Sequence, residues 1–251
     1  MRSRYVVKTM SSLAMGALLP VVAAAQTVPG GGIGQSAHNF ADYGDPPSGL
    51  CTFCHTPHKA QVQALLWNHK LSANTFTWSD PTTTAGTVYP SFKGDTYKGG
   101  TAKCLSCHDG SVAVGDVGWW AGGPANLDPT KLTGAYQTAS ATGSMTGNHP
   151  VAMPYPYLGA VNTYNGVKNG PATKLTDWLA DPQTVGIALY NDDGSGNISG
   201  GAVAGKSGIE CSSCHDPHNG SSVQDQYLLL GTLGGSNSGT NGYICLKCHV
   251  K

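Results

Sequence analysis

Four copies of one short pattern dominate this sequence of 251 residues. Each copy has two cysteines separated by two residues and a histidine directly after the second cysteine. The cysteines are Cys51, Cys54, Cys104, Cys107, Cys211, Cys214, Cys245 and Cys248, and the histidines are His55, His108, His215 and His249. This is the attachment pattern of c-type haem. Because the four copies use every cysteine of the chain, the pattern predicts four covalently bound haem c groups, numbered here in chain order.

The spacing fits the chemistry of attachment. Residues three apart lie on the same side of a helical turn, so both thiols reach the two vinyl groups of one haem. The adjacent histidine then comes under the iron as its proximal ligand. Four disulfides or zinc sites would use the same cysteines, but neither needs a histidine after every pair.

The four copies alternate between two kinds. The first kind, at Cys51 and Cys211, carries another histidine three residues after the first, whereas the copies at Cys104 and Cys245 do not. This order predicts a doubled repeat. We expect a first dihaem module over residues 26–125 and a second over residues 126–251.

The remaining histidines are candidates for the distal iron ligands. His58 and His218 cannot reach the far face of the haem bound by their own motif, so we assign His58 to the second haem and His218 to the fourth. The first and third haems then take ligands from upstream, from His38 and His149, and His69 is a spare. Four irons with two histidines each would be low-spin and would have low potentials, because methionine is the ligand that raises them.

Such six-coordinate irons favour electron transfer over catalysis, so we do not expect an enzyme. The alternative is a multihaem reductase of nitrite, hydroxylamine or a similar small substrate, with one open iron. A high-spin signal would distinguish this reductase from an electron carrier.

Residues 1–25 have the features of an export signal: basic residues, an apolar run and three alanines before the predicted cleavage. The run is short and contains Pro20, so we expect no membrane span. The whole chain has 14 basic and 14 acidic residues, and three of the basic ones lie in the signal. The mature chain would therefore be slightly acidic, which gives no reason to expect a nucleic-acid partner.

Composition and one loop add two further expectations. Glycine supplies 35 residues and charged residues only 11%, against a usual charged fraction of about 25%, so a large covalent cofactor is expected to help hold the chain together.

Residues 191–198 are similar to a calcium loop, but Ala202 stands where the bidentate glutamate belongs. Calcium therefore competes with a plain surface turn.

Several of these segments resemble the doubled-motif multihaem cytochromes of metal-reducing bacteria, and most closely the outer-surface tetrahaem cytochromes of the OmcE type, which polymerise into extracellular filaments. The resemblance rests on His38–Phe40, Cys51–His58, Leu66–Asn68, Cys104–Gly110, His149–Val151 and Cys211–His218.

The resemblance implies a mostly irregular fold, with short helices and turns wrapped round a haem stack and little strand. Tyr227–Leu230 is the best strand candidate. It also implies that subunits join head to tail outside the cell, exchange electrons with other cytochromes and extracellular acceptors, and can take one axial histidine from a neighbouring subunit, for which His38 is the candidate. The alternative is a soluble periplasmic shuttle with the same four haems.

Overall fold

The computed structural model describes residues 27–44, 47, 49–61, 64–170, 172–224, 227–234 and 242–250. The predicted export signal lies outside these residues. The α-helices are α1 (Gly49–Thr52), α2 (Gly100–His108) and α3 (Cys211–Cys214). The 3-10 helices are η1 (Ile33–Gln35), η2 (Ala64–Leu66), η3 (Gly134–Tyr136), η4 (Tyr157–Gly159), η5 (Ala172–Asp177), η6 (Pro182–Val185) and η7 (Ile244–Lys247).

Ten short strands form antiparallel sheets in the described part of the chain. The strands are β1 (Thr75–Phe76), β2 (Phe92–Lys93), β3 (Asp116–Trp120), β4 (Gly123–Asn126), β5 (Met153–Pro154), β6 (Thr163–Tyr164), β7 (Val167–Lys168), β8 (Tyr190–Asp192), β9 (Ile198–Gly200) and β10 (Ser207–Ile209). Three pairs, β1–β2, β3–β4 and β6–β7, stand alone, and the remaining strands form one sheet in the order β5-β10-β8-β9.

The expectation of a mostly irregular fold with little strand is therefore wrong, because the described residues form three α-helices and several antiparallel sheets. Tight turns explain the difference. Asn165 and Gly166 both have positive φ, 49° and 70°, between β6 and β7, which is the backbone that a two-residue hairpin requires.

The strand expected at Tyr227–Leu230 is also absent. Tyr227 and Leu228 have φ of 61° and 52°, which lies outside the extended region. Only Leu229 forms an isolated bridge, to His215.

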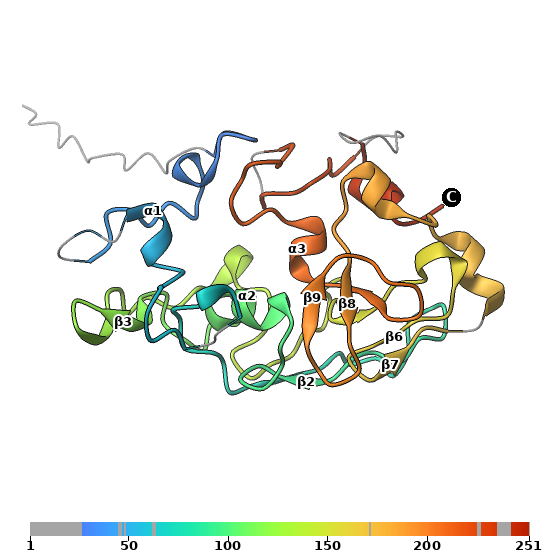
Figure 1. The fold of residues 1–251 in the computed structure, drawn as a ribbon, viewed down its shortest axis with the longest axis horizontal. Coiled ribbons are helices and arrows are strands. Elements are labelled where there is room, and N and C mark those ends of the chain that lie inside the picture. The colour runs from blue at the N-terminus through green and yellow to red at the C-terminus, as the bar shows by residue number, and fades with distance from the viewer. Residues whose placement is uncertain are drawn as a thin grey trace, which may run out of the picture.

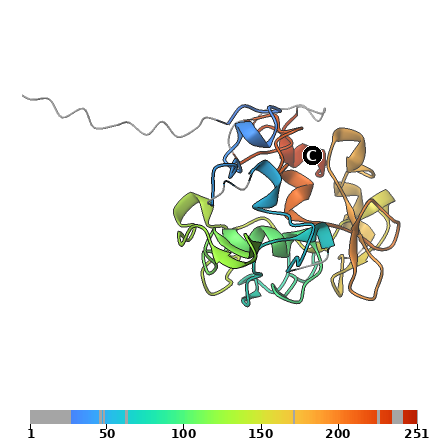
Figure 2. The same ribbon diagram turned by 60° about the vertical axis from the view of Figure 1, so that its left-hand side comes forward.

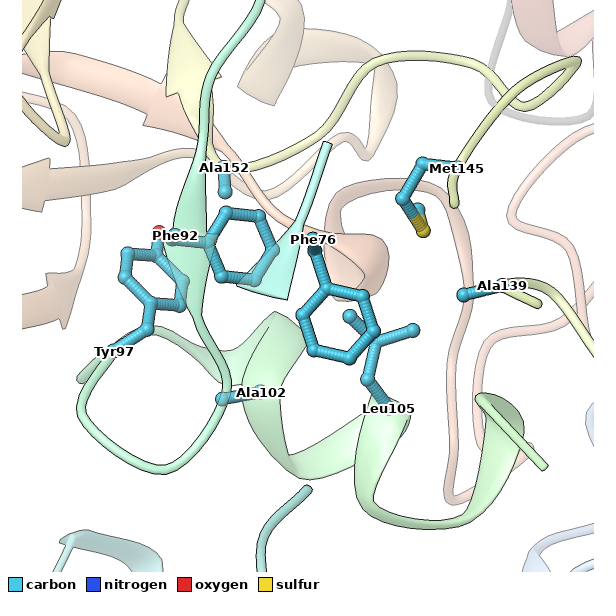
Figure 3. Packing of buried hydrophobic residues seen from close by; sticks show 8 residues of the cluster. All are labelled: Phe76, Phe92, Tyr97, Ala102, Leu105, Ala139, Met145 and Ala152. Atoms are coloured by element: carbon cyan, nitrogen blue, oxygen red, sulfur yellow. The ribbon is translucent and has the colours of Figure 1, made fainter. Parts of the chain in front are cut away.

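The buried apolar side chains form three separate clusters in the described residues. The cluster drawn in Figure 3 packs the inner face of α2 against β1 and β2 and comprises Phe76, Phe92, Tyr97, Ala102, Leu105, Ala139, Met145 and Ala152. The second lies by β5 and β10 and comprises Met153, Tyr155, Leu189 and Ile209. The third comprises Phe53, Val114 and Val117.

Two of the α-helices, α2 and α3, lie together in the middle of the molecule. Figures 1 and 2 both show them close together, with the β8–β9 hairpin beside α3, whereas α1 lies to the left of them in Figure 1. Helices α2 and α3 are in direct contact. Among the described residues, no helix is long and apolar enough to cross a membrane.

Candidate haem sites

Every Cys-x-x-Cys-His motif begins on a short helical turn. Cys51 lies in α1, Cys104 in α2, Cys211 in α3 and Cys245 in η7. In the three motifs that lie on the shorter helices, the backbone N–H of the histidine donates to the carbonyl of the first cysteine. The distances are 2.8 Å for His55, 3.0 Å for His215 and 2.9 Å for His249. The remaining motif, at Cys104, lies wholly within α2. The same turn therefore brings two thiols and one imidazole together four times.

Helix α2 shows how such a turn presents its chemistry. Cys104, Cys107 and His108 are half-buried, while the positions between them are buried. Leu105, which is 1% exposed, points into the core (Figure 3). One face of the helix thus anchors it, and the opposite face leaves the thiols and the imidazole open to a large group.

Backbone carbonyls orient the proximal imidazoles. Nδ1 of His55 lies 2.6 Å from the carbonyl oxygen of Leu65, Nδ1 of His108 lies 2.7 Å from that of Tyr136, and Nδ1 of His215 lies 2.6 Å from that of Tyr227. A hydrogen bond at Nδ1 leaves Nε2 free as the metal ligand. These carbonyls were missed in the sequence, where a backbone acceptor has no signal.

The two first-kind motifs share this support in detail. Leu65 and Leu66 have φ of 62° and 52°, and Tyr227 and Leu228 have 61° and 52°. Left-handed backbone costs a residue with a side chain about 1–2 kcal/mol. The chain adopts this strained conformation twice, at equivalent places, and each time it supplies the carbonyl that binds a proximal histidine.

Three of the proximal rings face a second imidazole. The ring centres of His38 and His108 lie 6.1 Å apart. Those of His55 and His218 lie 6.2 Å apart. Those of His149 and His249 lie 6.4 Å apart, and Nδ1 of His149 is 2.9 Å from the Pro150 carbonyl oxygen.

These separations match one metal ion between two imidazoles. A metal–imidazole nitrogen bond is about 2 Å long, so two rings on opposite sides of one ion place their centres roughly 6 Å apart. The residues therefore fit bis-histidine iron at the first, second and fourth motifs.

The pairs differ from those expected for all three of these distal histidines. His218 lies opposite His55 of the first motif, whereas we assigned it to the fourth haem. His38 lies opposite His108 of the second motif, whereas we expected it at the first or third. His149 lies opposite His249 of the fourth motif, whereas the sequence predicts it at the first or third.

The ring of His38 is positioned from within its own chain. Nδ1 of His38 lies 3.0 Å from the Pro217 carbonyl oxygen. The preceding segment is tied to buried Asn219, which accepts the Gly32 N–H at 2.9 Å and donates to the Val28 carbonyl at 2.8 Å. These contacts place His38 beside the second motif of its own chain.

His58 and His69 face no proximal ring in the described structure, and neither does His215 of the third motif. His58 is exposed. His69 is 1% exposed and packs against Phe53 and Trp67, with ring centres 4.9 Å and 5.4 Å away. Burial lowers the pKa of His69 to about 4, against a smaller opposing effect of the Phe53 backbone. His69 therefore lies in a core position, unlike the other histidines.

Thiols of motifs that are consecutive in the chain lie near one another. Burial raises the pKa of Cys107 to about 12, and the nearby Cys54 thiol adds to this rise. The Cys211 thiol is hydrogen-bonded to Cys104, which raises the pKa of Cys211. Burial raises the pKa of Cys214 to about 11, with a further contribution from Cys245. Neighbouring motifs thus meet as first to second, second to third and third to fourth.

All eight cysteines are described and all are free thiols, so none is joined in a disulfide. The described residues include no group of three or more histidine, cysteine or acidic side chains arranged round one metal ion. Each cysteine pair instead stands with a single histidine, the donor set that covalent haem requires.

The calcium-like loop forms the turn of the β8–β9 hairpin. The Asp193 carboxylate accepts hydrogen bonds from the Ser195 and Asn197 backbone N–H groups, at 2.8 Å and 3.2 Å, and from both side chains. Hydrogen bonds from Asn197 and Ser195 lower the pKa of Asp193. The loop satisfies this carboxylate from within, as an ordinary Asx turn does.

Comparison with protein-family models and with curated proteins gives no match to this chain.

Proposed function

We propose that this protein is a tetrahaem c-type cytochrome that carries electrons outside the cytoplasm. The observation that supports this most strongly is the set of three imidazole pairs with ring centres 6.1–6.4 Å apart, each including the histidine of a Cys-x-x-Cys-His motif. Bound haem supplies reversible one-electron chemistry. The protein's part is to hold, orient and space the four sites.

Each cysteine pair would hold one haem by two thioethers. The proximal ligands would be His55, His108, His215 and His249, and the distal ligands would include His218, His38 and His149 at the first, second and fourth motifs. The contacts between successive motifs support a single row in chain order. Cys51 and Cys245, in the first and last motifs, are the two exposed cysteines, so electrons would enter and leave at the two ends.

We further propose that the protein is the subunit of a head-to-tail extracellular filament. His215 faces no second ring in the described part of its own chain, and exposed His58 is without a ring to face. The exposed imidazole of His58 on one copy could therefore pair with His215 on the next copy. A head-to-tail contact of this kind can repeat without closing into a ring, which gives a filament. His58 would then bind the third iron across the subunit contact.

The alternatives are a periplasmic shuttle, in which His58 reaches the third iron of its own chain, and a reductase, in which that iron stays open. Both keep the same attachment sites. They differ in assembly and in the spin state of one iron.

The test uses protein produced in a host that attaches c-type haem. Pyridine haemochrome assay and intact mass should give four haems per chain, electron paramagnetic resonance should give low-spin signals only, and negative-stain microscopy should show filaments. Fewer than four haems would overturn the electron-transfer proposal. Monomers with all irons low-spin would leave the shuttle, and a high-spin iron that turns over nitrite or hydroxylamine would leave the reductase.

His58→Ala sharpens the same test. It should abolish filaments and leave four haems attached, with one of them high-spin. Filaments that form normally from this variant would overturn the role of His58 at the subunit contact.

A further inference from the structure

Glu210 is the one glutamate in the sequence, and its side chain is 1% exposed. It stands directly before Cys211 and has no role in attachment or ligation. Acidic side chains are almost never fully buried unless they are paired. The described residues show no ion pair for Glu210, so its burial needs another explanation.

Four hydrogen-bond donors surround the carboxylate. The hydroxyl of Tyr97 and the hydroxyl of Tyr164 both donate to Oε1, the latter at 2.6 Å. The backbone N–H of Thr101 donates to Oε2 at 2.7 Å, and the backbone N–H of Ser213 donates as part of a capping box. All four groups are donors, and several donors round one carboxylate are the arrangement that stabilises a negative charge.

The charge lies between the second and third motifs. Thr101 is in the first turn of α2, and Glu210 is the N-cap of α3. The Thr101 hydroxyl also accepts the Cys211 N–H at 3.2 Å. The carboxylate therefore contacts both helices that carry these two motifs, and it lies at the positive, N-terminal end of the backbone dipole of α2.

The field of Glu210 reaches the thiols of both motifs. It contributes to raising the pKa of Cys211, after the hydrogen bond and burial, and it opposes the lowering of the pKa of Cys104 by Cys211. It is not among the causes of the raised pKa of the second cysteine of any motif, so its influence falls on the first cysteines of the two inner motifs.

Among the described residues, no neighbouring cation forms an ion pair with Glu210. Lys103 is buried, but its ammonium donates to the Lys98 and Gly99 carbonyls, each at 3.3 Å. Burial lowers the pKa of Lys103, with an opposing contribution from Glu210. The hydroxyls of Tyr190 and Ser212 share a hydrogen bond. Burial raises the pKa of Tyr190, so its side chain is neutral.

We propose that Glu210 is a potential-setting residue, which holds the second and third haems at lower reduction potentials than the first and fourth. The proposal rests on the proposed function, because it needs four haems. Each reduction adds one electron to a haem and makes its charge more negative by one. A buried anion at the attachment helices opposes that change through a medium of low dielectric, and burial and local charge are known levers on haem potential.

The test is a spectroelectrochemical titration of the holoprotein and of Glu210→Gln, which keeps the size of the side chain and removes its charge. Two of the four midpoint potentials should rise, each by about tenfold in the reduction equilibrium, which is about 59 mV for a one-electron couple. The other two should stay within error. The matched control is Asp95→Asn, which removes an exposed carboxylate paired with Lys93 and should shift none of the four.

A second variant keeps the charge. Tyr164→Phe removes one donor from Glu210 and leaves the anion less neutralised, so the same two potentials should fall. If Glu210→Gln does not fold, this variant carries the test. Four attached low-spin haems with unchanged potentials in both variants would overturn the role of Glu210 and leave the proposed function standing, whereas a wild type without haem would end both proposals.

Discussion

The motifs at Cys51 and Cys211 have the same local backbone and different surroundings. In both, the residue after the proximal histidine donates its N–H to a left-handed leucine: Thr56 to Leu66 at 2.9 Å and Asp216 to Leu228 at 2.8 Å. The proximal histidine itself forms an isolated bridge in each case. The repeat inferred from the motif order therefore extends to the segment twelve or so residues further on.

The side chains within and before the two motifs differ. The first has Leu50 before it and Phe53 inside it, and Phe53 packs on Phe40 with ring centres 4.5 Å apart. The second has Glu210 before it and Ser213 inside it, and Ser213 Oγ accepts the Glu210 N–H at 3.0 Å. The outer copy is held by aromatic packing and the inner copy by a polar network, so one backbone design can place its haem in two electrostatic environments.

The largest effect should come from removing a distal ring from only one copy. His218→Ala removes the ring opposite His55, so we expect the first of the four irons to become high-spin while all four haems stay attached. The double variant with His58→Ala should add a second high-spin iron. Electron paramagnetic resonance checks both. An unchanged low-spin spectrum for His218→Ala would contradict the pairing.

The sequence determined the attachment turns well, because spacing within a helical turn is a local property. It could not place the ring partners. His55 and His218 are far apart in the chain, and their meeting depends on how the Pro217–Asn219 loop packs against the N-terminal segment. The hairpin at Asn165–Gly166 has a local signal, since an Asn-Gly pair is typical of a two-residue hairpin turn. The backbone carbonyls of Leu65 and Tyr227 have no such signal. Glu210 could have been noticed as the single glutamate beside a motif.

The packing that distinguishes the two copies should give the next largest effect. Phe53→Ala should lower the free energy of unfolding by about 3–5 kcal/mol, because it empties a buried aromatic position. The equivalent change in the other copy, Ser213→Ala, removes one hydrogen bond and should cost about 1–2 kcal/mol. Denaturant unfolding of the two holoproteins, followed by circular dichroism, measures the difference. Equal losses would show that the copies are held in the same way.

His69 packs on Phe53 in the first copy only and should make stability depend on pH. Its pKa is lowered to about 4, below the unfolded value of about 6.5. The unfolded chain therefore binds a proton that the folded chain does not, and stability falls as pH drops from about 6.5 to about 4, by up to ~3 kcal/mol. His69→Phe should remove this loss, so the variant should be the more stable protein at pH 5. Parallel curves for the two proteins between pH 7 and pH 4 would contradict it.

The smallest effect concerns the strained carbonyl supports that both copies share. Leu65 is 65% exposed and Tyr227 is 52% exposed, so replacing either by glycine loses little packing and relieves a left-handed backbone. We expect Leu65→Gly and Tyr227→Gly each to raise the free energy of unfolding by about 1 kcal/mol, or the melting temperature by about 2–4 °C. The control is Leu50→Gly, where the side chain is 41% exposed but the residue is helical, and this change should lower stability by about 1 kcal/mol. A gain in one copy and a loss in the other would show that the two supports are alike in shape but not in energy.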